Sequence, residues 1–103
     1  MPRYRNAESR PIDHLAEGEQ WPYGKLEEDA PLEARHAQAV GQRLHEAMQG
    51  RTNKEVAALA DITENTLGRL IRGQAWGALP ILIRLEAALD TDLWGGKTHQ
   101  NKR

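Results

Sequence analysis

The sequence predicts an all-α domain of four to five helices that follows an irregular N-terminal extension. Apolar residues recur at steps of three and four positions between residues 32 and 90, which is the period of an α-helix. Residues that favour helix ends stand where these apolar stripes begin and stop. No stretch alternates apolar and polar residues as a half-buried β-strand does. These observations together favour a bundle of short helices.

The composition narrows the class of protein. The chain has 103 residues, enough for one domain, and no cysteine, which excludes disulfides, thiolate metal sites and a cysteine nucleophile. The polar N-terminus lacks the apolar centre of a signal peptide, and no apolar run approaches the ~20 residues of a membrane span. We therefore expect a soluble cytoplasmic protein that does not contact a membrane.

Charge is distributed unevenly along the chain. Residues 1–33 carry four Lys and Arg against eight Asp and Glu, whereas residues 34–103 carry ten against seven. The mildly basic part suits a nucleic-acid partner.

The first 30 residues are rich in proline and glycine and poor in aliphatic side chains, so we expect them to be partly disordered or to dock on a partner. Residues 21–24, Trp-Pro-Tyr-Gly, predict a turn whose two aromatic rings are available for docking. The arm at residues 2–5, Pro-Arg-Tyr-Arg, leaves two interpretations open. It is either a terminus without contacts or a basic arm that enters the minor groove of DNA.

The first helix is predicted from Leu32 to about Gln49, with Pro31 at its start and Gly50 as its stop. Its apolar stripe consists of Ala37, Val40, Leu44, Ala47 and Met48.

Two short helices joined by a tight turn are predicted next. Thr52 and Glu55 form a capping box for a helix that ends near Ala60, with Val56, Ala57 and Leu59 as inward-facing candidates. After the turn at residues 61–62, Thr63 caps a second helix that runs through Arg72 and stops at Gly73. Ile62, Leu67, Leu70 and Ile71 supply the apolar side of this second helix, which leaves Glu64, Asn65, Gly68 and Arg69 on its outer face.

A last helix is predicted from about Leu79 to Asp90, and Leu93 and Trp94 are expected to close the core. Two roles remain open for Trp76 in the preceding loop: a plug against the core, or a contact with the DNA backbone or a partner. We divide the chain into an extension (1–30), a helix-turn-helix domain (31–94) and a polar basic tail (95–103).

The layout at residues 52–73 is that of a helix-turn-helix, in which the second helix presents its first turn to the major groove. Residues 56–73, VAALADITENTLGRLIRG, resemble the helix-turn-helix of the Cro/repressor (XRE) family, and the resemblance extends over about residues 34–94. It implies a lambda-repressor-like DNA-binding domain. Three positions depart from the family pattern: Asp61 stands where Gly is frequent, Gly68 where Ser is frequent, and Ile71 where Glu is usual.

The resemblance also implies residue roles. Thr63, Glu64, Asn65 and Thr66 match the base-reading first turn of the recognition helix, and Arg69 and Arg72 match positions near the DNA backbone. Asn53 occupies the place of a family Gln that contacts phosphate, and Thr52 caps its helix with a phosphate contact as a second role.

The expected function is that of a sequence-specific transcriptional regulator, in particular a repressor that binds a palindromic operator in double-stranded DNA as a homodimer. The rival hypothesis is a protein-interaction module such as an antitoxin, in which the segment Trp21–Asp29 clamps a partner. Histidines 14, 36, 45 and 99 show no metal-ligand spacing, and no nucleophile–base set or glycine-rich phosphate loop is present. We expect no enzyme activity, no metal and no cofactor.

Overall fold

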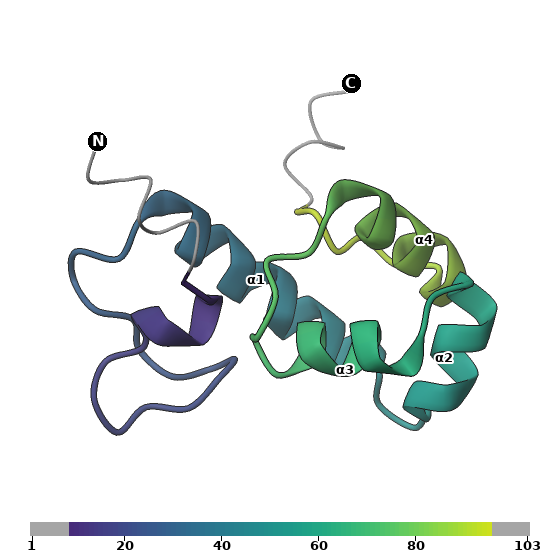
Figure 1. The fold of residues 1–103 in the computed structure, drawn as a ribbon, viewed down its shortest axis with the longest axis horizontal. Coiled ribbons are helices and arrows are strands. Elements are labelled where there is room, and N and C mark those ends of the chain that lie inside the picture. The colour runs from purple at the N-terminus through teal and green to yellow at the C-terminus, as the bar shows by residue number, and fades with distance from the viewer. Residues whose placement is uncertain (1–8, 96–103) are drawn as a thin grey trace.

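The fold is seen in a computed structural model that describes residues 9–95. A short 3-10 helix, η2 (Pro11–His14), precedes four α-helices: α1 (Leu32–Ala47), α2 (Asn53–Ala60), α3 (Glu64–Ile71) and α4 (Leu79–Leu89). The described part contains no β-strand, only an isolated bridge between Leu15 and Leu26. Figure 1 shows α1 running between the N-terminal residues on one side and α2 and α4 on the other, with α3 in front. The predicted all-α class is confirmed.

Local sequence signals set the ends of the two central helices. The Thr52 hydroxyl accepts a hydrogen bond from the Glu55 backbone N–H at 3.1 Å, and the Glu55 carboxylate accepts from the Thr52 N–H at 3.2 Å. This reciprocal pair is the predicted capping box. Helix α2 then ends at Asp61, whose φ of 60° places it in the left-handed region that Asp tolerates better than most residues.

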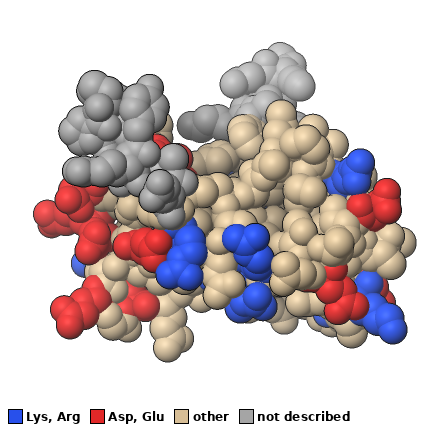
Figure 2. Space-filling model, viewed as in Figure 1, with Lys and Arg blue, Asp and Glu red and all other residues tan. Residues whose placement is uncertain are grey.

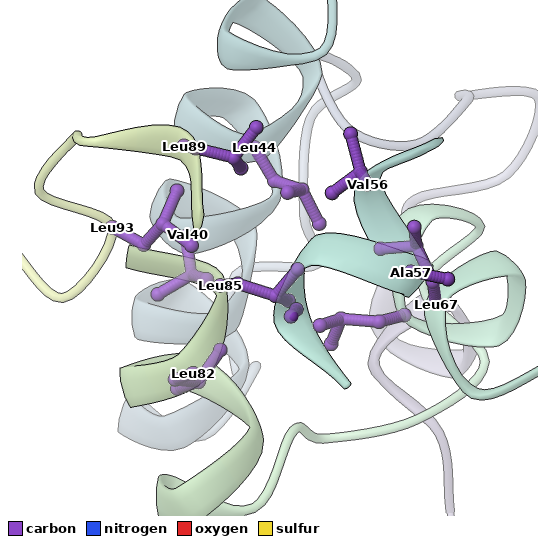
Figure 3. Close-up of a cluster of buried hydrophobic side chains, with 11 residues drawn as sticks. Val40, Leu44, Val56, Ala57, Leu67, Leu82, Leu85, Leu89 and Leu93 are labelled. Atoms are coloured by element: carbon purple, nitrogen blue, oxygen red, sulfur yellow. The ribbon is translucent and has the colours of Figure 1, made fainter. Parts of the chain in front are cut away.

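The apolar faces of the four α-helices meet in one core, part of which is drawn in Figure 3. Leu44, Val56, Leu67 and Leu85 each expose none of their surface, and they come from four different helices. Leu93, beyond the end of α4, is equally buried and closes the core as predicted, whereas the same prediction for Trp94 is wrong because that side chain is exposed. Ala57 is 2% exposed and lies where α2 meets its neighbours, a position that suits a small side chain. Every helix is therefore held by side chains of the others.

The prediction that Leu59 faces inward is wrong, because 66% of its surface is exposed. Val56, Ala57 and Ala60 form the buried face of α2. At 100° per residue, position 59 lies about a quarter of a turn or more away from the centre of that face. An apolar side chain does not by itself determine which face of a short helix is buried.

Residues 9–30, which we name the N-terminal lobe, fold against the helices without regular secondary structure beyond η2. Leu26 and Ala30 form a second small core with Ala34 of α1, and Leu15 and Trp76 pack against it. Residues 21–24 make the predicted turn. This is more order than the proline- and glycine-rich composition led us to expect for this part of the extension, because the lobe takes its contacts from α1 and not from its own periodicity.

Side chains on one face of α1 bind backbone carbonyl groups of the lobe. Gln42 donates from Nε2 to the Pro22 carbonyl at 3.0 Å, and Gln38 donates to the Gly24 carbonyl. Arg35 reaches the Glu28 carbonyl at 3.0 Å. Since these three α1 residues recur at steps of three and four, they form a polar stripe along one side of the helix.

Within residues 9–95 no helix combines the length and the apolar character needed to cross a bilayer. The basic arm at residues 2–5, His99 and the tail beyond Gly95 lie outside the described residues.

Candidate nucleic-acid interface

The outward face of α3 carries a stripe of polar and basic side chains. Asn65, Arg69 and Arg72 follow one another at steps of four and three residues, so they lie along the same side of the helix. All three are exposed, while Leu67 and Leu70 on the opposite side are buried in the core. The helix therefore separates a buried apolar face from a face available to a partner.

The first turn of α3 is fixed by Thr63. Its hydroxyl accepts from the Thr66 backbone N–H at 3.0 Å and donates to the Thr66 hydroxyl at 2.9 Å. The two threonine hydroxyls thus hydrogen-bond to each other within the first turn of α3. Glu64 and Asn65, by contrast, are exposed, and their side chains make no hydrogen bond with any other described residue. Their functional groups are available for an external donor or acceptor.

The start of α2 supplies two further predicted site residues. Thr52 and Asn53 are both exposed, and the Thr52 side chain is engaged in the capping box. Neither residue forms a hydrogen bond with the side chains of α3 in the described part of the chain. The predicted site thus includes two separate helix N-termini, which the packing of α2 on α3 joins, besides the two arginines at the C-terminal end of α3.

Gln74 joins the two arginines of α3 and was missed by sequence reasoning. Arg69 donates to the Gln74 backbone carbonyl at 3.4 Å, and Arg72 donates to the Gln74 side-chain oxygen at 3.4 Å. The Gln74 N–H in turn donates to the Arg69 carbonyl at 2.8 Å. A polar residue directly after a helix-stopping glycine was the only available signal, and it does not distinguish Gln74 from an ordinary loop residue.

Gly68 lies on the outer face as expected from its spacing to Asn65 and Arg72, but it is buried there because the Arg72 side chain covers it. A Cβ built on Gly68 would lie 3.0 Å from the Arg72 guanidinium, so the arginine folds back over the glycine one turn earlier. The absence of a side chain at residue 68 therefore leaves room for the guanidinium close to the helix backbone.

Charge changes sign across the face that carries α3. Figure 2 shows basic side chains in the middle of the view, where α3 lies in Figure 1, and acidic side chains gathered over the N-terminal lobe. The lobe contains Asp13, Glu17, Glu19, Glu27, Glu28 and Asp29. A polyanion approaching α3 is attracted by the arginines and repelled by the lobe, so the field favours contact at the helix and disfavours it beside the lobe.

Trp76 packs the loop before α4 against the lobe. Its indole Nε1 donates to the Ser9 carbonyl at 2.8 Å, and its ring packs against the small core around Leu26. The indole therefore serves packing within the chain, the first of the two roles left open for it.

Comparison with protein families agrees with this geometry. A family model described as helix-turn-helix matches residues 44–93. Among solved structures, the restriction-modification controller protein C.AhdI from Aeromonas hydrophila is similar at 30% identity, over 53% of this chain and 86% of that chain, with a TM-score of 0.49. No curated protein matches the chain.

The matched residues run from the last turn of α1 to Leu93, so they include α2, α3 and all of α4. The matched region also contains every predicted contact residue of α2 and α3. The chain belongs to the helix-turn-helix family of DNA-binding proteins, of the Cro/repressor (XRE) type.

Proposed function

We propose that the protein is a sequence-specific transcriptional regulator that acts as a repressor, with α3 in the major groove of a palindromic operator. The observation that carries this proposal is the free polar pair at the start of α3: Glu64 and Asn65 are exposed and unpaired among the described residues. Free polar groups at this position of a groove-binding helix read base edges.

The chemistry of each side chain gives it a role. Asn65 pairs in bidentate fashion with adenine, Glu64 accepts from the cytosine amino group, and the Thr66 methyl contacts thymine. Since a carboxylate is repelled by phosphate, Glu64 contributes to binding only where it meets a base. It therefore acts in specificity.

The remaining residues act mainly on the DNA backbone. Thr52, Asn53 and Thr63 stand at helix N-termini, where backbone N–H groups and short polar side chains suit phosphate. Arg72 contacts phosphate, and Arg69 contacts phosphate or guanine.

A homodimer completes the proposal. Two copies related by two-fold symmetry place their recognition helices in successive major grooves, about 34 Å apart. Repression then follows from occupation of promoter DNA.

The experiment is selection of bound duplexes from a randomised pool, followed by fluorescence anisotropy on the enriched site. We expect one palindromic motif. Asn65→Ala should weaken binding to that motif by ~1–3 kcal/mol and leave non-specific binding unchanged, whereas Arg72→Ala should weaken binding to all sequences. Affinity should also fall steeply with salt, because phosphate contacts release counterions.

The interaction-module hypothesis gives the opposite result: no enriched motif, and no effect of Asn65→Ala. Its proposed clamp lies in the lobe, where the packing of Trp21 on Gly41 and Gly73 withdraws part of that ring from a partner, while Tyr23 stays exposed. The structure thus offers this alternative less support than the sequence did.

A further inference from the structure

We propose that Trp21 is a positioning residue for the recognition helix, acting through residues 73 and 74 on the two arginines of α3. This inference rests on the proposed function for its meaning in DNA binding. Its structural basis is a contact between segments that are far apart in the sequence.

The indole of Trp21 is wedged between two glycines. A Cβ built on Gly41, in the middle of α1, would lie 2.9 Å from Trp21 Cζ2 and Nε1. A Cβ built on Gly73, just after α3, would lie 2.7 Å from Trp21 Cδ2. Because real Cβ atoms do not approach other atoms this closely, the ring fits only where both neighbours lack a side chain.

A second lobe residue holds the same point. The backbone N–H of Ile12, in η2, donates to the Gly73 carbonyl at 3.1 Å, and the Ile12 side chain would meet a Cβ on Gly73 at 2.5 Å. Gly73 has a φ of 75°, so only glycine adopts this backbone conformation readily. The end of α3 is therefore fixed by one hydrogen bond and by apolar contact from two sides.

This fixed point lies next to the basic part of the proposed interface. Gln74 follows Gly73 directly and binds both Arg69 and Arg72 through its backbone and side-chain oxygens. A shift of residue 73 moves Gln74, and with it the groups that orient both guanidinium groups. The first turn of α3 is held instead by its own cap at Thr63, so Trp21 acts on the phosphate-binding end of the helix and not on the base-reading end.

The lobe is anchored firmly enough to act as a support. Gln38 and Gln42 of α1 bind the backbone on the C-terminal side of Trp21, and the Tyr23 hydroxyl donates to the Glu46 carboxylate at 3.0 Å. Since α1 also packs directly on α3, the lobe and the two helices form a closed ring of contacts. Through its contacts with Gly41 and Gly73, Trp21 thus couples the position of the end of α3 to that of α1.

The first test measures order without DNA. Backbone amide order parameters are recorded by NMR for the full chain and for Trp21→Ala. We expect the amides of residues 72–74 to fall from the rigid range, about 0.85, toward values below about 0.6, with residues 64 and 65 unchanged. Unchanged order at residues 72–74 overturns the proposal whether or not the protein binds DNA.

The second test measures binding to the selected operator at a temperature where every variant is folded. Trp21→Ala should weaken binding roughly 10-fold and lower the salt slope by about one phosphate contact. Trp21→Phe, which keeps a ring in the wedge, should restore most of the affinity. Leu89→Ala, a buried change in α4 outside the interface, serves as the control for lost stability and should bind like the parent chain.

A double-mutant cycle separates the positioning role of Trp21 from a general loss of stability. If Trp21 acts through Arg72, the change Arg72→Ala should have little further effect once Trp21→Ala is present. Additive losses would overturn the proposed route through Arg72. Absence of specific binding by the parent chain contradicts the proposed function instead, and the NMR result then decides the positioning role alone.

Discussion

The helical domain and the N-terminal lobe are held together by different forces. In the helical domain, leucine and valine side chains from four helices share one core, which Figure 3 shows as a continuous cluster. In the lobe, backbone carbonyls bind polar side chains of α1, and the apolar contribution comes from a small core around Leu26 and from the wedge of Trp21. A regular apolar pattern builds an independent core, whereas an irregular segment acquires its shape from the surface on which it lies.

This difference has a thermodynamic consequence. Apolar burial is spread over all helices of the domain, so loss of one core side chain weakens the whole cooperative unit. The lobe has fewer buried apolar contacts, so it can open while the helices remain folded. The same chemical change should therefore have different effects in the two regions.

The largest effect is expected for Leu85→Ala. Leu85 exposes none of its surface and belongs to the main core, so truncation should lower the free energy of unfolding by about 2–5 kcal/mol. Urea denaturation followed by circular dichroism measures this loss. The outcome that contradicts the described core is a loss no larger than that of the matching change in the lobe.

That matching change is Leu26→Ala, at a residue 8% exposed in the small core. We expect a loss of global stability of at most about 2 kcal/mol, the low end for such truncations, because opening of the lobe limits the cost. Hydrogen exchange should show faster exchange in residues 9–30 and at the end of α3, with α2 and α4 protected as before. Equal loss of protection in α4 would mean that the lobe and the domain unfold as one unit.

A smaller effect is expected at the cap of α3. Thr63→Ala removes the acceptor for the Thr66 N–H and should lower the free energy of unfolding by about 1 kcal/mol. Thermal denaturation of the free protein measures this loss apart from any role in binding. Thr63→Ser keeps the hydroxyl and is the control; if it is as destabilised as Thr63→Ala, the lost methyl group and not the cap is responsible.

The smallest effect is expected from pH and should be confined to the lobe. Hydrogen bonds from the Arg10 side chain, at 3.0 Å, and from the Arg10 backbone N–H, at 2.7 Å, hold the pKa of Asp13 below its ordinary value of 3.8. A lowered carboxyl pKa stabilises the folded state above the ordinary value, and this contribution is lost as the pH falls through the folded-state pKa.

The prediction is therefore a slight loosening of η2 on acidification below the ordinary pKa of Asp13. The backbone amide signals of residues 10–15 in NMR spectra report it. Asp13→Asn should remove this pH dependence, and a dependence that persists in that variant must come from another group.

Most of the helical domain could be predicted because its signals are local. Thr52 and Glu55 cap α2, Thr63 caps α3, and the apolar stripes repeat at helical spacing, so each feature depends on residues within a few positions of one another. Leu59 was placed wrongly because a short helix leaves the direction of its buried face open until its neighbours are present. The exposure of Glu64, Asn65, Arg69 and Arg72 followed from the same periodicity.

The lobe and its effect on the site were beyond such reasoning. The sequence around Gly41 and Gly73 does not indicate that Trp21 packs on both glycines. Likewise, Gly68 gave no indication that Arg72 would cover it. The stripe of Arg35, Gln38 and Gln42 was visible as polar spacing, but a polar stripe on a helix is ordinarily a solvated face. Only the path of the chain shows that its partners are the carbonyl groups of residues 22–28.

The sequence by itself thus determined the four helices, the caps of α2 and α3 and the polar face of the recognition helix, because these depend on hydrogen bonds and side-chain spacing within one or two helical turns. Only the tertiary structure decided where the lobe lies, that Trp21 packs between Gly41 and Gly73, and that Gln74 binds both arginines. Contacts between residues distant in the sequence depend on how packed surfaces fit together, and no local pattern records that fit.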